Sequence, residues 1–354
     1  MNNIYLQIPL RKPDISELVL ATVTSTTGST PQKPGSSALF SRYKLVAGTV
    51  GGGILEGKVQ QIALESVITK KSGHYLFRLD NRVESGEDAL CGGKISVLID
   101  SGLERHVHVL EAMRKSSASR IPGVLVTVIS KIKGEEVNIK RYWCTNNSES
   151  HNIPELEPGI RSELSSMISS SGHSDFRKIE LTAGEEPETL VFLESVIPQP
   201  RLYIAGAGHI GKALTQIAAM LDFEITVIDD RPEFANPENL PFADHIITDD
   251  IGKAISRIEK GPDTYFVIVT RGHRDDGKAL KECIGSDAAY LGMIGSRNKT
   301  NMMRKEFIEK GWASQDQWDR IFAPIGLEIR SQTVGEIAVS IAAQLVQVRN
   351  AKGA

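Results

Sequence analysis

The sequence contains few cysteines and no long apolar run, and these absences narrow the class of protein. Its 354 residues include three cysteines, Cys91, Cys144 and Cys283, which stand far apart without a CxxC motif. Neither a disulfide framework nor a structural zinc site is therefore expected. No stretch approaches the roughly 18 apolar residues of a membrane span, and the N-terminus lacks the apolar core of a signal peptide. We expect a cytoplasmic protein that is neither exported nor embedded in a membrane.

An excess of positive charge is also absent. Lys and Arg number 41 against 44 Asp and Glu, which gives a formal net charge of -3. Because the basic residues are scattered along the chain, no nucleic acid partner is expected. Apolar residues make up 40% and charged residues 24%, as in folded globular proteins, and a chain of this length is expected to form two domains.

The second half of the chain alternates short apolar strands with helical segments. This pattern begins at Arg201 and ends in an amphipathic helix at 333–350, in which Thr333 and Glu336 have the spacing of a capping box. Such alternation builds a parallel sheet through right-handed crossovers. We therefore predict an α/β fold class, with a C-terminal Rossmann-like parallel sheet that carries helices on both faces, in a domain spanning 201–354.

The first half predicts a mixed α/β domain at 1–197. Pro198-Gln199-Pro200 cannot continue a central strand and marks a linker, and the Ser/Glu/Pro-rich stretch at about 147–175 is predicted to be a variable insertion with one helix. Further predictions include strands at 18–24, 37–40 and 44–50, a helix with Ile54 among the residues of its buried face and Gly73 as its stop, and a hairpin across Gly134.

The segment GAGHIG at 206–211 follows an apolar strand and opens a helix. Gly206 would permit a tight turn, Gly208 would let the backbone approach a phosphate, and Gly211 would let the helix pack on the strand. The free amides and the helix dipole favour an anion. Asp229 or Asp230 ends the next strand, where a ribose hydroxyl would bind. The alternative is a turn that is kept for packing and binds nothing.

Two further groups lie at the same predicted sheet edge, because each follows a parallel strand. Gly295-Ser296-Arg297 offers a hydroxyl, a guanidinium and free amides to an anion, or else a helix cap beside an exposed arginine. Arg271-Gly272-His273 precedes Asp275 and Asp276. His273 could exchange protons or bind a metal, but a surface cap or an ion pair is the plainer interpretation, since no second histidine stands at ligand spacing.

Three glycine clusters stand in the first half: GSTPQKPGSS at 28–37, GTVGGG at 48–53 and CGG at 91–93. Glycines admit backbone to a bulky ligand or allow a positive φ, although each cluster alone also fits an ordinary turn. Together with GAGHIG, VIDDRPEF, VTRGHRDDGKAL, LGMIGSRNK and IGLEIRSQTVGEIAVSIAAQLV, these clusters make the chain resemble the XdhC/CoxI family from about Ala21 to Val348.

This resemblance implies a maturation chaperone of xanthine and carbon monoxide dehydrogenases. Such a protein binds the molybdenum cofactor (molybdopterin) in a cleft to which both domains contribute, protects it during sulfuration, and inserts it into a xanthine dehydrogenase-type client. A cysteine desulfurase is a further implied partner, and a homodimer is the default assembly. The residues that match the family's motifs are Gly28, Ser29, Thr30, Pro31, Gly35, Gly51, Gly52, Gly53, Glu56, Cys91, Gly92 and Gly93, followed by Gly206, Gly208, His209, Gly211, Asp229, His273, Asp276, Gly295, Ser296 and Arg297.

Within this set, Cys91 could ligate molybdenum or relay sulfur as a thiolate, or it could be a small residue beside a turn. The chain departs from the family pattern at Arg271, where many relatives have a histidine, and at Arg330, where they have a small residue. Two rival functions stay open: an NAD(P)-dependent oxidoreductase with His273 as its acid/base, and a nucleotide-sensing regulator. Cys91, His273 and Asp276 are the candidate catalytic residues. The chain is not expected to be a xanthine dehydrogenase itself, because three cysteines cannot ligate two iron-sulfur clusters.

Overall fold

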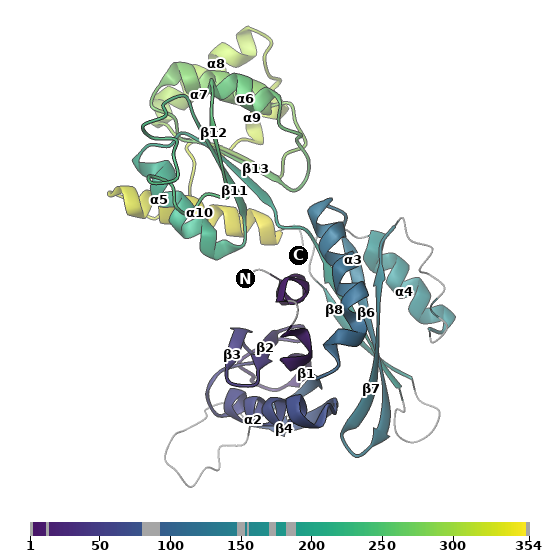
Figure 1. Ribbon diagram of the computed structural model, residues 1–354. Helices are drawn as coiled ribbons and strands as arrows, with labels where there is room; N and C mark the ends of the chain where they lie inside the picture. The colour runs from purple at the N-terminus through teal and green to yellow at the C-terminus, as the bar shows by residue number, and fades with distance from the viewer. Residues whose placement is uncertain are drawn as a thin grey trace. The chain divides into compact units, whose positions relative to one another are not determined.

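A computed structural model of the protein divides the chain into two compact units, Met1–Pro198 and Gln199–Ala354 (Figure 1). The boundary falls within the Pro-Gln-Pro segment. Among the described residues, no helix has the length and apolar character to cross a membrane. The structure describes residues 3–11, 14–79, 93–146, 153, 156–169, 175–181 and 189–351.

The N-terminal unit is built on a sheet of nine described strands in the order β3-β2-β1-β5-β4-β7-β6-β9-β8. Each neighbouring pair is antiparallel. The strands are β1 (Leu18–Thr27), β2 (Ser37–Ser41), β3 (Leu45–Gly48), β4 (Gly73–Arg78), β5 (Lys94–Asp100), β6 (Gly123–Lys133), β7 (Glu136–Cys144), β8 (Phe176–Leu181) and β9 (Thr189–Val196). The helices are α1 (Ile4–Gln7), α2 (Gly53–Thr69), α3 (Val107–Ala118) and α4 (Pro158–Ser169), with 3-10 turns at Ile8–Arg11, Asp14–Glu17 and Leu103–His106.

Alternation of side chains along the strands gives this sheet two different faces. On one face, Val23 of β1 packs with Val59 of α2 in one apolar cluster, and Val126 of β6 packs with Leu164 of α4 in another. Intervening positions of β1 and β6 contribute to a third cluster, on the opposite face, together with α1 and α3. Helices α2 and α4 therefore cover the same face of the sheet, and α1 and α3 cover part of the other.

The helix that was predicted to end at Gly73 ends earlier, at Thr69. Lys70 adopts a left-handed conformation (φ 56°), and its amide donates to the Ser66 carbonyl. Gly73 instead begins β4, where a Cβ atom would lie 2.5 Å from the Tyr75 ring. The prediction of Gly73 as the helix stop was therefore wrong.

Ile54 was also wrongly predicted on the buried face of α2. Its side chain is exposed, whereas the neighbouring Leu55 is buried. The buried residues of α2 recur every three to four positions from Leu55 to Val67, and Ile54 lies outside this stripe.

Two local predictions for this unit are confirmed. The hairpin predicted across Gly134 is formed by β6 and β7, which pair along most of their length. The helix predicted within the stretch at about 147–175 is α4. Both predictions depended only on short-range patterns in the sequence.

The C-terminal unit contains a sheet of five described strands in the order β12-β11-β10-β13-β14, and every neighbouring pair is parallel. This confirms the predicted Rossmann-like sheet. The strands are β10 (Arg201–Ala205), β11 (Glu224–Asp229), β12 (His245–Thr248), β13 (Thr264–Ile268) and β14 (Tyr290–Met293).

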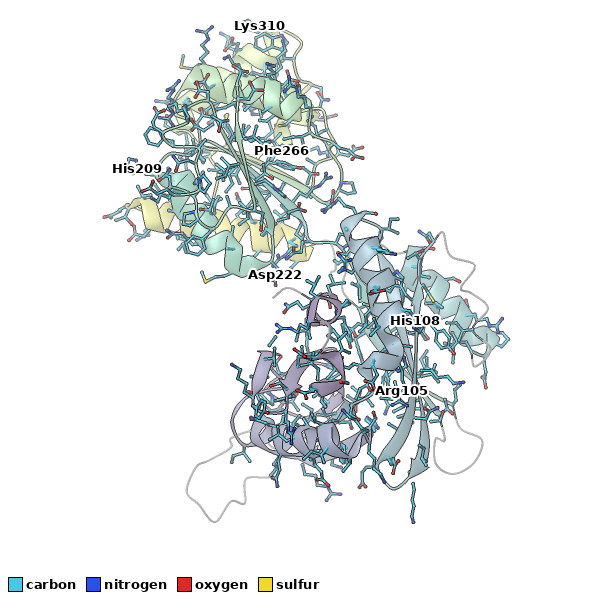
Figure 2. All side chains as sticks on the ribbon, viewed as in Figure 1. Arg105, His108, His209, Asp222, Phe266 and Lys310 are labelled. Atoms are coloured by element: carbon cyan, nitrogen blue, oxygen red, sulfur yellow. The ribbon has the colours of Figure 1, made fainter. Side chains whose placement is uncertain are left out.

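Helices cover both faces of this parallel sheet (Figure 1). Leu214 of α5 and Ile341 of α10 pack on one face, and Leu280 of α7 and Phe307 of α8 pack on the other. Phe266 of β13 lies inside the unit (Figure 2). The helices are α5 (His209–Ala218), α6 (Ile251–Ser256), α7 (His273–Cys283), α8 (Arg297–Glu309), α9 (Gln315–Asp319) and α10 (Val334–Ala351), with a 3-10 turn at Ala219–Leu221.

The start of α10 confirms the predicted capping box. The Glu336 amide donates to Thr333 Oγ1 at 3.3 Å, and the Thr333 amide donates to Glu336 Oε2 at 2.9 Å. Just before it, Arg330 has a φ of 61°. This left-handed conformation is least costly for glycine.

Candidate functional site

The carboxyl ends of the parallel strands bring the predicted C-terminal site segments to one edge of the sheet. The strand order reverses between β10 and β13, and open α/β sheets bind ligands at such a switch point. The glycine turn after β10 lies directly against the end of β13, because a Cβ atom on Gly206 would lie 2.5 Å from the Val269 carbonyl oxygen. The turn and the segment at 270–273 therefore flank the same point.

Each glycine of the turn has a distinct environment. Gly206 has a φ of 119°, which favours glycine. A Cβ atom on Gly211 would lie 1.9 Å from the Gly206 carbonyl oxygen, whereas one on Gly208 would meet no atom within 4 Å. Gly206 and Gly211 are thus required by the fold, and Gly208 faces open space.

Helix α5 begins at this open position. Gly208 is its N-cap and provides no side-chain hydrogen bond to the first turn, so the first amides of α5 are left for solvent or a ligand. His209 follows as an exposed residue at the surface of the unit (Figure 2). This arrangement suits a phosphate.

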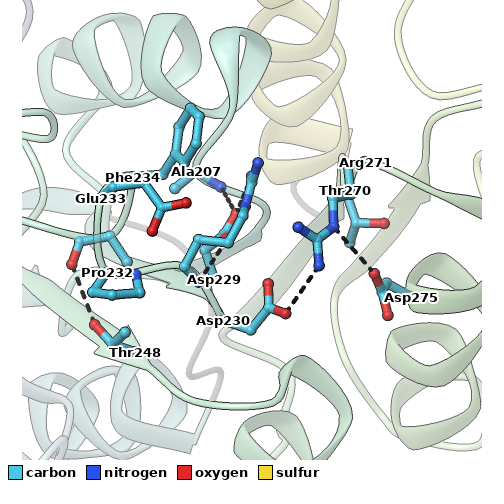
Figure 3. Close-up of polar contacts among 12 residues, drawn as sticks. Ala207, Asp229, Asp230, Pro232, Glu233, Phe234, Thr248, Thr270, Arg271 and Asp275 are labelled. Carbon is cyan, nitrogen blue, oxygen red and sulfur yellow. Dashed lines mark hydrogen bonds and ion pairs between the residues drawn. The ribbon is translucent and has the colours of Figure 1, made fainter.

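Asp229, at the end of β11, is buried beneath the turn (Figure 3). Its Oδ2 accepts from the Ala207 amide at 2.8 Å, and Arg231 donates to both of its oxygens through Nε and Nη2, each at 2.9 Å. Burial opposes ionisation of Asp229, but these hydrogen bonds outweigh it and hold its pKa below the usual value. Asp229 is thus a buried, fully paired carboxylate.

Asp230 points to a different partner (Figure 3). Its Oδ2 accepts from Arg271 Nη2 at 3.1 Å, and Arg271 Nε also lies 3.8 Å from Asp275 Oδ2. Arg271 therefore joins the end of β11 to the start of α7. Its contacts are ion pairs at the surface.

The segment after β13 places His273 and Asp276 in different environments. His273 is exposed at the first turn of α7, with Nε2 at 3.7 Å from Glu306 Oε2. Asp276 is buried, accepts from Thr270 Oγ1 at 2.6 Å, and pairs with Lys299. These contacts match the plainer interpretation of His273 as part of an ion pair.

The segment after β14 caps α8. Ser296 Oγ accepts from the Lys299 amide at 3.2 Å, and Arg297 is exposed. Gly295 lies beside this cap, where a Cβ atom would be 3.2 Å from the Lys299 side chain. Ser296 is therefore partly committed to the helix, while the Arg297 guanidinium faces solvent.

In the N-terminal unit, the structure brings the glycine clusters together. A Cβ atom on Gly51 would lie 2.6 Å from Pro31, and one on Gly93 would lie 2.5 Å from the Ser29 carbonyl oxygen. The segment at 28–31 thus contacts both other clusters, a proximity that the sequence alone did not reveal.

The start of α2 is open at this glycine cluster. Gly51, Gly52 and Gly53 have φ values of 137°, 69° and 54°, and Cβ atoms on Gly52 and Gly53 would meet no atom within 4 Å. Glu56 Oε2 accepts from Thr49 Oγ1 at 2.6 Å and from the Val50 amide at 3.1 Å. Glu56 therefore holds the loop that leads into α2.

The other predicted site residues of the N-terminal unit either lie in the turn at 28–31 or fall outside the described residues. Thr30 Oγ1 donates to the Gln32 carbonyl at 3.0 Å, and Gly28 has a φ of 74°. Cys91 and Gly92 lie outside the described residues. Among the residues that are described, no group of three or more His, Cys, Asp or Glu side chains is placed to hold a metal ion.

A buried polar group on the second face of the N-terminal sheet was not predicted. Asp100 and Arg141 form a buried ion pair, and Tyr5 and Glu194 line the same small cavity as Arg141. Burial raises the pKa of Glu194 to about 7, against the opposing effects of Tyr5 and Arg141. Polar residues at inward positions of otherwise apolar strands were the available signal, and only the pairing of the strands shows that they meet.

The fold and the site define an α/β protein whose second unit is a Rossmann-type domain with an open glycine turn at the start of α5. The family description "XdhC Rossmann domain" matches residues 202–345, and "XdhC and CoxI family" matches residues 16–80. The chain belongs to the XdhC and CoxI family.

The chain is also similar to individual proteins and to a solved structure. The chain is 26% identical over 351 residues to a probable xanthine dehydrogenase subunit of Bacillus subtilis (strain 168), covering 99% of this chain and 98% of that protein. It is 35% identical over 161 residues to the "Uncharacterized protein YqeB" of Escherichia coli (strain K12), covering 45% of this chain and 29% of that protein. A crystal structure described as a xanthine dehydrogenase from Bacillus halodurans has a TM-score of 0.76 at 22% identity, covering 99% of this chain and 96% of that one, and shares its fold.

Proposed function

We propose that this chain binds the molybdenum cofactor, holds it during sulfuration and inserts it into a xanthine dehydrogenase-type molybdenum hydroxylase. Family membership and the similarity, along almost the whole chain, to a probable xanthine dehydrogenase subunit support this proposal. The observation that carries it is the open first turn of α5 at Gly208, which suits the phosphate of a pterin ligand.

The proposed role is delivery of the cofactor and not the client's own reaction. The three cysteines of the sequence are too few for two iron-sulfur clusters with Cys₄ ligation. In our proposal the pterin phosphate binds the amides after Gly208, and Gly52 and Gly53 leave room for a ligand beside α2. The thiolate of Cys91 is proposed to ligate molybdenum or to relay sulfur.

The proposed partners follow from this role. They are a xanthine dehydrogenase-type client and a cysteine desulfurase that supplies sulfur, in the cytoplasm, with the chain acting as a homodimer. NAD(P) is the rival ligand of the glycine turn, and its binding with turnover would indicate an oxidoreductase instead.

The test is to purify the chain from a host that makes molybdopterin and to identify the retained small molecule by mass spectrometry. We expect the wild type to retain the pterin and Gly208→Ala to lose most of it, because the added methyl group would occupy the space of the phosphate. Gly335→Ala is the matched control, since its Cβ atom would also meet no atom within 4 Å but lies in α10. Cys91→Ala should keep the pterin and lose molybdenum or sulfur.

Two results would contradict the proposal. One is a wild-type protein that retains no pterin, and the other is a protein that binds NAD(H) tightly and oxidises a substrate with it. Equal retention by the wild type and Gly208→Ala would show that the pterin binds elsewhere.

A further inference from the structure

The Asp229 carboxylate accepts four hydrogen bonds from within the protein, and it lies beside the Ala207 amide (Figure 3). Oδ1 accepts from the backbone amide of Arg231 at 3.1 Å and from its Nε at 2.9 Å. Oδ2 accepts from the Ala207 amide at 2.8 Å and from Arg231 Nη2 at 2.9 Å. A carboxylate offers about four lone-pair sites, so each oxygen of Asp229 is fully used within the protein.

Arg231 is held in this position by more than one contact. Its guanidinium makes a bidentate pair with Asp229 and lies 4.0 Å from the centre of the Phe234 ring. Bidentate charge-assisted hydrogen bonds are among the strong ones in proteins, and the aromatic ring adds a cation–π contact. Moving Arg231 away from Asp229 would therefore cost the free energy of both the bidentate pair and the cation–π contact.

An acidic residue at the end of the second strand of a Rossmann sheet normally accepts hydrogen bonds from a ribose diol. In this chain, Asp229 can accept them only after Arg231 has moved. The neighbouring Asp230 pairs with Arg271, away from the Ala207 amide that marks the glycine turn (Figure 3). The turn thus has an open place for a phosphate, but the carboxylate beside it is already occupied.

We propose that Arg231 makes this site select against ribose diols, so that it takes a pterin phosphate monoester in preference to a dinucleotide. This inference rests on the proposed function, which assigns the glycine turn as the phosphate site. Arg231 is a specificity-determining residue that acts by occupying Asp229. A nicotinamide or cytosine dinucleotide that places its ribose at the end of β11 would have to break the Arg231–Asp229 pair.

The test measures NADH affinity by calorimetry in the full chain. The wild type should bind NADH weakly, and Arg231→Ala should bind it at least about tenfold more tightly, because hydrogen bonds to a charged group no longer have to be broken. Arg231→Gln, which removes the charge but keeps a polar side chain with an N–H donor, should gain less NADH affinity. Arg271→Ala is the matched control and should gain nothing, because Arg271 pairs with Asp230.

A double variant, Arg231→Ala with Asp229→Asn, separates the role of the Arg231–Asp229 pair from a general loss of positive charge. It should lose the gain in NADH affinity, because an amide no longer provides a carboxylate to the diol. Circular dichroism and thermal unfolding check that each variant is folded. The proposal is overturned by a wild type that binds NADH as tightly as Arg231→Ala, or by a folded Arg231→Ala and a folded Arg231→Gln that both show no gain.

Pterin retention in the same proteins distinguishes the two proposals. If Arg231→Ala gains NADH affinity but the wild type retains no pterin, the proposed function is contradicted and the proposed role of Arg231 is supported. If the wild type retains the pterin but no variant gains NADH affinity, only the proposed role of Arg231 is contradicted.

Discussion

Gly211 packs against Gly206 so closely that a Cβ atom on Gly211 would lie 1.9 Å from the Gly206 carbonyl oxygen. The obstacle is backbone, which cannot move aside as a flexible side chain would. Gly211→Ala should therefore lower the free energy of unfolding by about 1–3 kcal/mol or more, as overpacking does. Denaturant unfolding monitored by circular dichroism measures this change.

Gly208→Ala provides the comparison for that prediction. Its Cβ atom would meet no atom within 4 Å, so its cost should be limited to the poorer N-cap that alanine makes for α5, about 1 kcal/mol or less. Equal stability of the wild type and Gly211→Ala would contradict the close approach of α5 to the turn.

Glu194 gives the N-terminal unit a specific pH dependence. Its pKa is about 7 in the folded protein against 4.5 for an ordinary glutamate. Between these values the folded state binds more protons than the unfolded state, so stability falls as the pH rises from 4.5 through 7. A pKa difference of this size corresponds to a loss of about 3 kcal/mol in the free energy of unfolding.

The variant Glu194→Gln tests this dependence, because glutamine resembles the protonated side chain and does not titrate. It should gain stability relative to the wild type as the pH rises from about 4.5 to about 8, as measured by denaturant unfolding at both values. Burial also lowers the pKa of His74 to about 4, but that effect is present in both proteins and cancels in the difference. A pH-independent difference would contradict the raised pKa.

The buried Arg141–Asp100 pair should be costly to break. Both side chains are almost completely buried, and Arg141→Met would leave the Asp100 carboxylate without its counter-charge. We expect a loss of about 3–5 kcal/mol in the free energy of unfolding. Chemical denaturation measures it.

Lys71→Ala is the surface control for this prediction. Lys71 pairs with Glu136 at 3.0 Å, but its side chain is 65% exposed, so its removal should cost less than about 1 kcal/mol. A similar small cost for Arg141→Met would show that Asp100 finds another way to be neutralised.

Much of the fold was predictable because it depends on local patterns. The alternation of strands and helices after Arg201 indicated the parallel sheet, and the spacing of Gly206, Gly208 and Gly211 indicated the turn. Gly73 shows the limit of such patterns. The helix before it ends at Thr69, and the left-handed residue that follows is Lys70. The preference for glycine after a helix end therefore does not predict where this helix ends.

The site was less predictable because its contacts join distant residues. The sequence placed Asp229 at the end of a strand but could not show that Arg231 occupies it, since a side chain two positions away can point in many directions. The contact between Gly93 and Ser29 depends on the pairing of β1 with β5. The buried ion pair of the N-terminal unit joins β5 to β7 across β4. Such relationships follow from tertiary structure.

The last helix, α10, supplies Ala338, Ile341, Ala342 and Leu345 to the same apolar cluster as β10 and β11. During synthesis this helix leaves the ribosome long after the strands on which it packs, because the chain is made from its N-terminus. The C-terminal unit can therefore complete its core only once α10 has emerged, since domains fold as units. A nascent chain that is released before Ala338 would leave this cluster uncovered and become a substrate for aggregation or proteolysis.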